Sequence, residues 1–330
     1  MQLGKRCTWH GLGEHLPQNC SVEDMLRIAR IDWGVRLEPV YRLVNDAQGN
    51  KVPEQYTGRN FLVRDGGDVL DVVGPDYAPI QNGQVAEFFR EFIEADPETG
   101  VRRATIEAAG SLRGGRYVWM LAKMNAGFEF QRGDRNEAYL LALKPHQQGQ
   151  ACHIGATGTR VVCMNTTRIA LGWDGHSIID EQAGRFTIRH NQTWDDRLIS
   201  QAREFIMATR EGIIAFGQFA ERLATKKVTQ ADVIRILAPV YQKPTETLTV
   251  DQMIANPDAL LNRPMKRLLS AMDNAPGADP GNLWGVYNAV TYYTDHMVGR
   301  SRDIRLASAW SGEGGQNKAK VLNKLVELAA

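Results

Sequence analysis

The chain is poor in cysteine, with four among 330 residues, and its formal net charge at pH 7 is only +1. Four scattered cysteines are too few for the disulfide framework of a secreted domain, so we expect a reducing, cytoplasmic compartment. No stretch approaches the roughly 18 consecutive apolar residues of a membrane span. The first residues also lack the apolar core of a secretory signal. These absences predict a globular protein that works away from the membrane.

Signatures of catalysis and metal binding are scarce as well. The loop of residues 155–159 has two glycines but matches neither a phosphate-binding P-loop nor a dinucleotide fingerprint. The N-terminal cysteines and histidines are spaced unlike the ligands of a compact zinc site; they are Cys7, His10, His15 and Cys20. One cluster could serve a metal-dependent nuclease: Asp174, His176, Asp180 and Glu181. We therefore expect no catalytic residue, metal or cofactor, and keep a nuclease as the alternative.

Basic residues are concentrated in the middle of the chain. Residues 102–170 contain ten lysines and arginines against four acidic residues, whereas residues 1–100 contain ten against sixteen. A locally basic surface on a nearly neutral chain indicates a polyanionic partner such as nucleic acid.

The basic segment contains a strongly predicted β-hairpin over residues 104–124. Gly114 and Gly115 suit a two-residue turn, because both can adopt the positive φ angles that such turns need. This turn places Gly110 opposite Trp119, so that the indole covers the bare glycine. It also places Leu112 opposite Tyr117. Alternation then predicts one shared face: Ile106, Ala108, Leu112, Tyr117, Trp119 and Leu121.

The turn carries two arginines, Arg113 and Arg116, directly opposite each other. Like charges in that position cost about 0.2–1 kcal/mol. An anion bound between the two guanidinium groups would offset this repulsion. The simpler interpretation, a solvated tip with its arginines splayed into water, stays open.

The length fits about two domains of roughly 150 residues, and we expect an α+β fold. Residues 1–227 are predicted to form an α+β core, in which antiparallel hairpins are backed by a long amphipathic helix over residues 193–226. A second hairpin is expected over residues 60–73, with its turn at Gly66 and Gly67. Residues 228–330 show only helical patterns and are predicted to form an all-helical C-terminal region.

Several helix starts are marked by capping residues. Ser21 and Thr229 each precede an aspartate by three residues, which is the arrangement of a capping box. Asn82 is expected to cap a helix with an apolar stripe that begins at Val85. Asn165 is expected to open a short helix.

Five groups of residues also occur together in a recognisable order. They are Trp9-His10-Gly11-Leu12-Gly13; Val73-Gly74 with Tyr77 and Pro79-Ile80-Gln81-Asn82; Gly110-Ser111-Leu112-Arg113-Gly114-Gly115-Arg116; Arg160-Val161-Val162-Cys163 with Asn165-Thr166; and Gly299-Arg300-Ser301-Arg302. The set resembles the phage/plasmid-related protein family, which is filed under a domain of unknown function. The resemblance covers most of the chain. It implies a bacterial mobile element as the source but assigns no mechanism.

The expected architecture, a hairpin sheet with a long backing helix, is also similar to the single-strand annealing recombinases, the group of the Redβ and Erf proteins. That similarity implies a homo-oligomeric ring or filament that holds single-stranded DNA in a basic groove and anneals strands. Phosphate contacts would give affinity and stacked bases would add to it. The candidate DNA-binding residues are Arg102, Arg103, Arg113, Arg116, Tyr117, Lys144, Arg160 and Arg168.

Two points stay open. Tyr117 and Trp119 could stack on bases, but Leu112 and Leu121 on the same predicted face favour core packing instead. A non-catalytic interaction protein, with the helical C-terminal region as its docking part, is a further alternative.

Overall fold

A computed structural model describes residues 12–93, 104–130, 134–160, 165–168, 185–190, 197, 201, 215–242, 247–276 and 278–329. The fold is α+β, with antiparallel strand pairs and several C-terminal helices, as the sequence predicted. The chain forms two compact units. The first contains residues 1–125, 140–155 and 186–205, and the second contains residues 126–139, 156–185 and 206–330.

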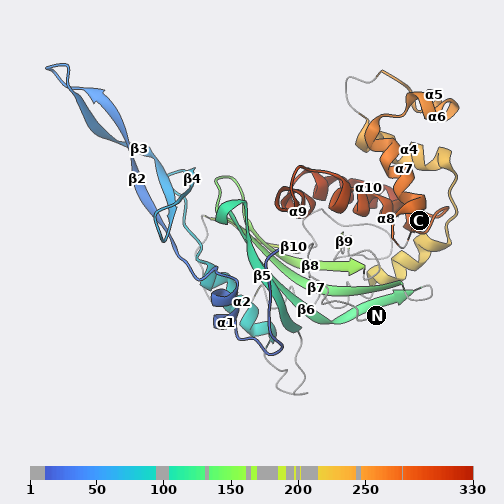
Figure 1. The fold of residues 1–330 in the computed structure, drawn as a ribbon, viewed down its shortest axis with the longest axis horizontal. Helices are drawn as coiled ribbons and strands as arrows, with labels where there is room; N and C mark the ends of the chain where they lie inside the picture. The colour runs from blue at the N-terminus through green and yellow to red at the C-terminus, as the bar shows by residue number, and fades with distance from the viewer. Residues whose placement is uncertain are drawn as a thin grey trace. The chain divides into compact units, whose positions relative to one another are not determined.

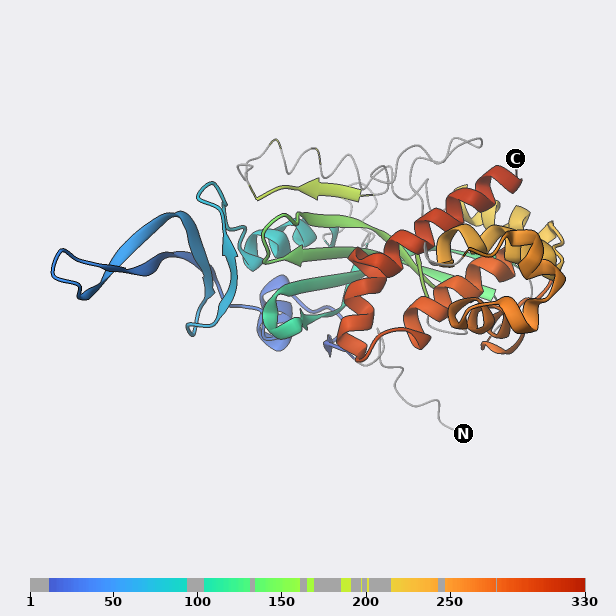
Figure 2. The ribbon, with the colours of Figure 1, turned by 90° about the horizontal axis from the view of Figure 1, so that it is seen from above.

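Within the described residues, seven strands form one sheet in the order β1-β5-β6-β7-β8-β10, and β9 pairs with β8. Figure 2 shows β5 to β8 side by side. The strands are β1 Glu14–His15, β5 Ala104–Leu112, β6 Tyr117–Phe130, β7 Asp134–Pro145, β8 Cys152–Arg160, β9 Asn165–Arg168 and β10 Arg185–Ile188.

The central hairpin, β5 with β6, has the predicted register, but its turn is longer than the two residues expected. Arg113–Gly115 form a 3₁₀ turn, so the ladder ends at Leu112 and Tyr117 and the two arginines are not a cross-strand pair. Leu112 lies opposite Tyr117 and Gly110 lies opposite Trp119. A Cβ atom on Gly110 would lie 3.3 Å from the indole of Trp119 and 2.8 Å from Cα of Gly13, so both cover the glycine. The predicted alternation fails at one place, because the register shifts between Ile106 and Ala108. Such a β-bulge bends the strand locally.

A second sheet contains β2 Val35–Asn45, β3 Lys51–Arg64 and β4 Val69–Val73. The predicted turn between β3 and β4 is confirmed, with φ angles of 97° at Gly66 and 95° at Gly67. The outer parts of β2 and β3 form a hairpin that the sequence analysis missed. We call residues 40–56 the β-arm, which Figure 1 shows as a twisted two-stranded ribbon.

The base of this second sheet has a small hydrophobic core. It consists of Val35, Leu62, Leu70, Val73 and Tyr77, with Trp33 and Leu37 packed against it. The core anchors the β-arm and also fixes the segment that follows β4.

One helix prediction is wrong. Residues 165–168, expected to open a helix, form strand β9, in which Asn165 lies opposite Arg160 and Thr167 lies opposite Gly158. The two threonines are β-branched residues that suit a pleated strand, and pairing with β8 outweighs the local capping signal of Asn165.

The capping predictions at Ser21 and Thr229 are confirmed. Ser21 accepts a hydrogen bond from the backbone of Asp24 at the start of α1, Val22–Ile28. Thr229 and Asp232 form a complete capping box at the start of α4, Gln230–Tyr241. Residues 215–225 are helical, and the rest of the predicted helix of residues 193–226 lies largely outside the described residues.

The described secondary structure after Gln230 is helical. It consists of α4, α5 Val250–Ala255, α6 Pro257–Leu260, α7 Arg263–Asn274, α8 Leu283–Tyr292, a π-helical turn Tyr293–Met297, α9 Arg302–Ser311 and α10 Glu313–Ala329. Its core includes Trp284, which packs edge-on against Phe216 and tilted against Tyr287. In the part of the chain that the structure describes, no helix is both long and apolar enough to cross a membrane.

Candidate nucleic-acid interface

The hairpin tip, residues 113–116, exposes the two arginines that the sequence singled out. Arg113, Gly114 and Gly115 adopt positive φ angles of 53°, 70° and 93° in succession. The carbonyl of Arg116 accepts a 2.8 Å hydrogen bond from the backbone N–H of His146. The Arg113 guanidinium lies 5.7 Å from the ring centroid of Tyr117, within cation–π range. The tip therefore has a defined backbone and two cationic side chains that reach solvent.

A third guanidinium lies against the tip. A Cβ atom on Gly115 would be only 3.1 Å from Nη1 of Arg64, so this glycine lets the Arg64 side chain approach the turn. Arg64 also lies over the indole of Trp33, at 5.7 Å, and forms an ion pair with Asp68. Sequence reasoning missed Arg64, because its strand is separated from the hairpin by about fifty residues.

Tyr117 is not a platform for bases. Its side chain is buried, and its hydroxyl exchanges hydrogen bonds with the carboxamide of Gln150, at 3.0 and 3.1 Å. Trp119 is buried as well. The core-packing interpretation is therefore the correct one for both rings.

The prediction that Lys144 contacts phosphate is wrong, because this residue is only 1% exposed. It lies near the end of β7, where its neighbours Leu143 and Pro145 are buried too. Its Nζ lies 2.9 Å from Nδ1 and 2.8 Å from Nε2 of His146. Strand β7 has a neighbouring strand on each side, so a lysine in it can be buried despite its charge. The prediction was wrong because it used the residue type alone.

His146 joins Lys144 to Asn82, the first residue of α2, Asn82–Ile93. The Asn82 amide donates to the carbonyls of Ile31 and Trp33, at 3.0 and 3.1 Å, which leaves its oxygen to accept from Nε2 of His146 at 3.0 Å. Nε2 therefore carries the proton, and Nδ1 accepts from Lys144. The predicted N-cap is thus wrong, because the Asn82 side chain hydrogen-bonds the carbonyls of Ile31 and Trp33 and not the backbone N–H groups of its own helix.

Burial sets the protonation of this cluster. Desolvation lowers the pKa of Lys144 to about 7, because burial disfavours the charged form of the amine. Desolvation likewise lowers the pKa of His146, and it lowers the pKa of His190 to about 4. Burial raises the pKa of the Cys152 thiol to about 12. Near neutral pH the two histidines and the thiol are therefore uncharged, whereas the Lys144 amine is about half protonated.

The other predicted residues are only partly described. Arg102 and Arg103 lie outside the described residues, as do Cys7, His10 and the acidic cluster of the nuclease alternative. Only the backbones of Arg160 and Arg168 are described; they lie opposite Asn165 and Thr157 in the β8–β9 ladder. Among the described ranges, no group of three or more histidine, cysteine or acidic side chains could hold a metal ion.

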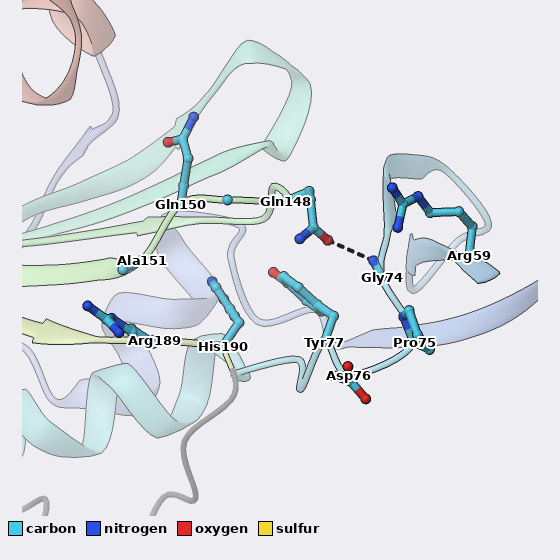
Figure 3. A pocket seen from close by; sticks show the side chains of 11 residues that line it. Arg59, Gly74, Pro75, Asp76, Tyr77, Gln148, Gln150, Ala151, Arg189 and His190 are labelled. Atoms are coloured by element: carbon cyan, nitrogen blue, oxygen red, sulfur yellow. Dashed lines mark hydrogen bonds between the residues drawn. The ribbon is translucent and has the colours of Figure 1, made fainter.

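A hollow of about 500 Å³ lies in the first unit, and Figure 3 shows its lining side chains. Its walls come from Arg59 of β3, residues 74–77 after β4, residues 148–151 between β7 and β8, and residues 189–190 after β10. Gln150 belongs to both features, because it lines the hollow and bonds Tyr117 beneath the tip.

The model of a protein family described as a domain of unknown function, DUF932, matches residues 69–311. No curated protein and no solved structure matches the chain. The match covers β4 to α9, including the hairpin tip, the buried cluster and nearly all of the hollow.

Proposed function

Because the chain belongs to the DUF932 family, whose description assigns no activity, we propose a function from its own residues. The protein binds single-stranded DNA and anneals complementary strands, acting as a homo-oligomer and without catalytic chemistry. It serves homologous recombination of a phage or plasmid in the cytoplasm. The hairpin tip, with Arg113 and Arg116 exposed on a fixed turn, is the observation that carries this proposal.

The tip suits a flexible polyanion better than a small anion. Its guanidinium groups lie on a turn that projects from a sheet, and Arg64 adds a third beside them. Contacts of this kind bind phosphates without reading sequence, as strand annealing requires. No metal or nucleophile is needed, because annealing makes and breaks no covalent bond.

The β-arm supports self-association. Leu43 is 67% exposed and Tyr41 is 57% exposed, and they neighbour each other on one face of the ribbon, opposite Pro53 and Gln55. A two-stranded hairpin is marginally stable alone, and contiguous apolar residues at a surface mark interaction sites. Docking of the arm on a second copy would cover these side chains.

The first experiment tests the DNA contact by its salt dependence. Wild type and the Arg113→Gln, Arg116→Gln double variant are titrated against labelled poly-dT at several salt concentrations, with fluorescence anisotropy as the readout. The slope of log K against log salt is negative, and each lost phosphate contact should make it shallower by about 0.7, so the slope of the double variant should be shallower than that of wild type by about 1.4. The charge-reversed pair, Arg113→Glu with Arg116→Glu, should abolish binding.

The matched control is Arg27→Gln with Arg90→Gln. It removes the exposed guanidinium of Arg27 and the partly exposed one of Arg90, which pair with Asp24, Glu23 and Glu87 on α1 and α2. Its salt slope should equal that of wild type. Equal slopes for the tip variant and wild type would remove the tip from the DNA site.

Annealing itself is measured with complementary strands that carry a fluorescence donor and acceptor. Wild type should accelerate annealing, and the charge-reversed variant should not. Failure to bind single strands at low salt would refute the proposal in favour of an interaction protein. Cleavage that requires Mg²⁺ or Mn²⁺ would favour the nuclease.

A further inference from the structure

The hollow beside the hairpin tip contains a buried polar group without a partner. Tyr77 is 8% exposed, and its hydroxyl has no hydrogen-bond partner among the residues that the structure describes. Buried polar groups in folded proteins are nearly always paired, so an orphan hydroxyl calls for an explanation. Figure 3 shows this hydroxyl pointing into the hollow, toward Gln148.

The walls around Tyr77 are fixed, so the hollow has a defined shape. The Tyr77 ring stacks on His190, with 4.4 Å between centroids and 16° between planes. His190 is itself within hydrogen-bond distance of the carbonyls of Pro145 and Ala78, at 3.1 and 3.3 Å. A side chain held in this way cannot swing outward to find another partner.

The opposite wall is equally constrained. The side-chain oxygen of Gln148 accepts a 2.7 Å hydrogen bond from the backbone N–H of Gly74, and the backbone N–H of Gln148 donates to Asp71 at 2.7 Å. The oxygen of the Gln148 carboxamide is therefore engaged, which leaves its NH₂ group to donate. Figure 3 shows that group on the side of Tyr77.

The lining defines the chemistry of a ligand. Burial raises the pKa of Tyr77, so its hydroxyl stays protonated and can donate, as can the amide of Gln148. A ligand that presents acceptor atoms at the centre of the hollow can therefore satisfy both groups at once. Figure 3 places Arg59 and Arg189 at opposite ends of the hollow, whereas the carboxylate of Asp76 points away. A nucleotide unit within a strand offers this arrangement, because its base carries acceptor atoms and a negatively charged phosphate lies on each side of it.

We infer that the hollow receives one nucleotide of the single strand that the hairpin tip binds. The base enters the hollow and accepts hydrogen bonds from Tyr77 and Gln148, and the adjoining phosphates lie at Arg59 and Arg189. This inference rests on the proposed function. Gln150 links the two sites, because its carboxamide bonds Tyr117 beneath the tip while it lines the hollow.

The test removes only the orphan hydroxyl and varies the strand. Tyr77→Phe keeps the ring that stacks on His190, so its thermal unfolding should match that of wild type. Its affinity is measured for poly-dT and for an all-abasic strand of equal length, which keeps the phosphates and lacks every base. We expect about tenfold weaker binding of poly-dT, the usual effect of one lost hydrogen bond, and unchanged binding of the abasic strand.

Two further variants complete the experiment. Tyr292→Phe, on α8 in the second unit, is the matched control and should leave both affinities unchanged. Arg59→Gln should make the slope of log K against log salt shallower by about 0.7 with either strand, since it removes one phosphate contact.

The outcomes separate this inference from the proposed function. If Tyr77→Phe weakens the binding of poly-dT and of the abasic strand equally, the hydroxyl contacts the DNA backbone, and base insertion is overturned. No weakening of either strand, while the Arg113 and Arg116 variants still lose affinity, would overturn the pocket and leave the proposed function standing. Failure of wild type to bind any single strand would overturn both.

Discussion

The buried amine of Lys144 gives the protein a pH dependence that can be calculated. Its pKa is lowered from the ordinary 10.5 to about 7 by burial. Between these values the unfolded chain binds a proton that the folded chain does not, so folding stability should rise with pH. Each full pH unit is worth about 1.4 kcal/mol, and because the amine is half protonated at pH 7 the gain between pH 7 and pH 9 is about 2 kcal/mol. Below pH 7 this contribution is constant, because both states are then protonated.

The Lys144→Met variant isolates this term, because it keeps most of the side-chain volume and has no titrating group. Free energies of unfolding are measured by urea denaturation, followed by circular dichroism, at several pH values in that window. The free energy of unfolding of wild type, relative to that of the variant, should rise by about 2 kcal/mol from pH 7 to pH 9. Higher pH is avoided, because burial raises the pKa of the Cys152 thiol to about 12 and deprotonation then opposes folding.

Lys51→Met, at an exposed position of the β-arm, is the matched control and should give a constant difference from wild type. Parallel pH curves for Lys144→Met and wild type would refute the reasoning. They would mean that the amine reaches solvent or carries its charge in the folded protein.

Three other changes should have defined effects. Gly110→Ala should lower the free energy of unfolding by about 1–3 kcal/mol, because its Cβ would lie 2.8 Å from Cα of Gly13; an unchanged thermal midpoint would contradict this packing. Asp295→Ala should cost about 3–5 kcal/mol, because it removes the carboxylate that lies 2.5 Å from the buried ammonium of Lys318. The double variant Asp295→Leu with Lys318→Met removes both charges and should regain most of the lost free energy of unfolding, as measured by urea denaturation. An equal loss in the single and the double variant would argue against the ion pair. Leu43→Ser should reduce the oligomer mass measured by sedimentation, and an unchanged mass would exclude this face of the β-arm from self-association.

The register of the central hairpin next to its turn could be predicted because its signals are local, although the turn itself is longer than predicted. Two adjacent glycines fix the turn, the turn fixes the register, and the register places Gly110 under Trp119. The same reasoning located the turn at Gly66 and Gly67. The bulge between Ile106 and Ala108 had no comparable local signal.

The β-arm was not predicted because its second strand, the outer part of β3, contains residues that are uncommon in strands. Pro53 and Glu54 are disfavoured in strands, yet they pair with β2 in a regular ladder. The available signal was the turn: the carboxylate of Asp46 accepts hydrogen bonds from the backbone of Gln48 and Asn50, at 2.9 and 2.8 Å. Aspartate commonly closes turns in this way.

The burial of Lys144 could not be predicted because its cause is nonlocal. His146 is near in sequence, but Asn82 is sixty-four residues from His146, and Ile31 and Trp33 are farther still. A basic residue in a basic segment was assigned to the surface by its type alone. Likewise, Tyr77 lines the hollow only because β4 and β10 bring their following segments together.

The cationic tip and the buried cluster of Lys144, His146 and Asn82 are joined at His146. Its ring contacts Lys144 and Asn82, while its backbone N–H holds the carbonyl of Arg116. A substitution at Lys144 should therefore disturb the placement of the tip without removing a phosphate contact. Loss of a contact changes the salt slope, whereas misplacement weakens binding at every salt concentration by a similar factor. Lys144→Met should accordingly lower the affinity for poly-dT with the wild-type slope, and a reduced slope would return Lys144 to the DNA-contacting surface.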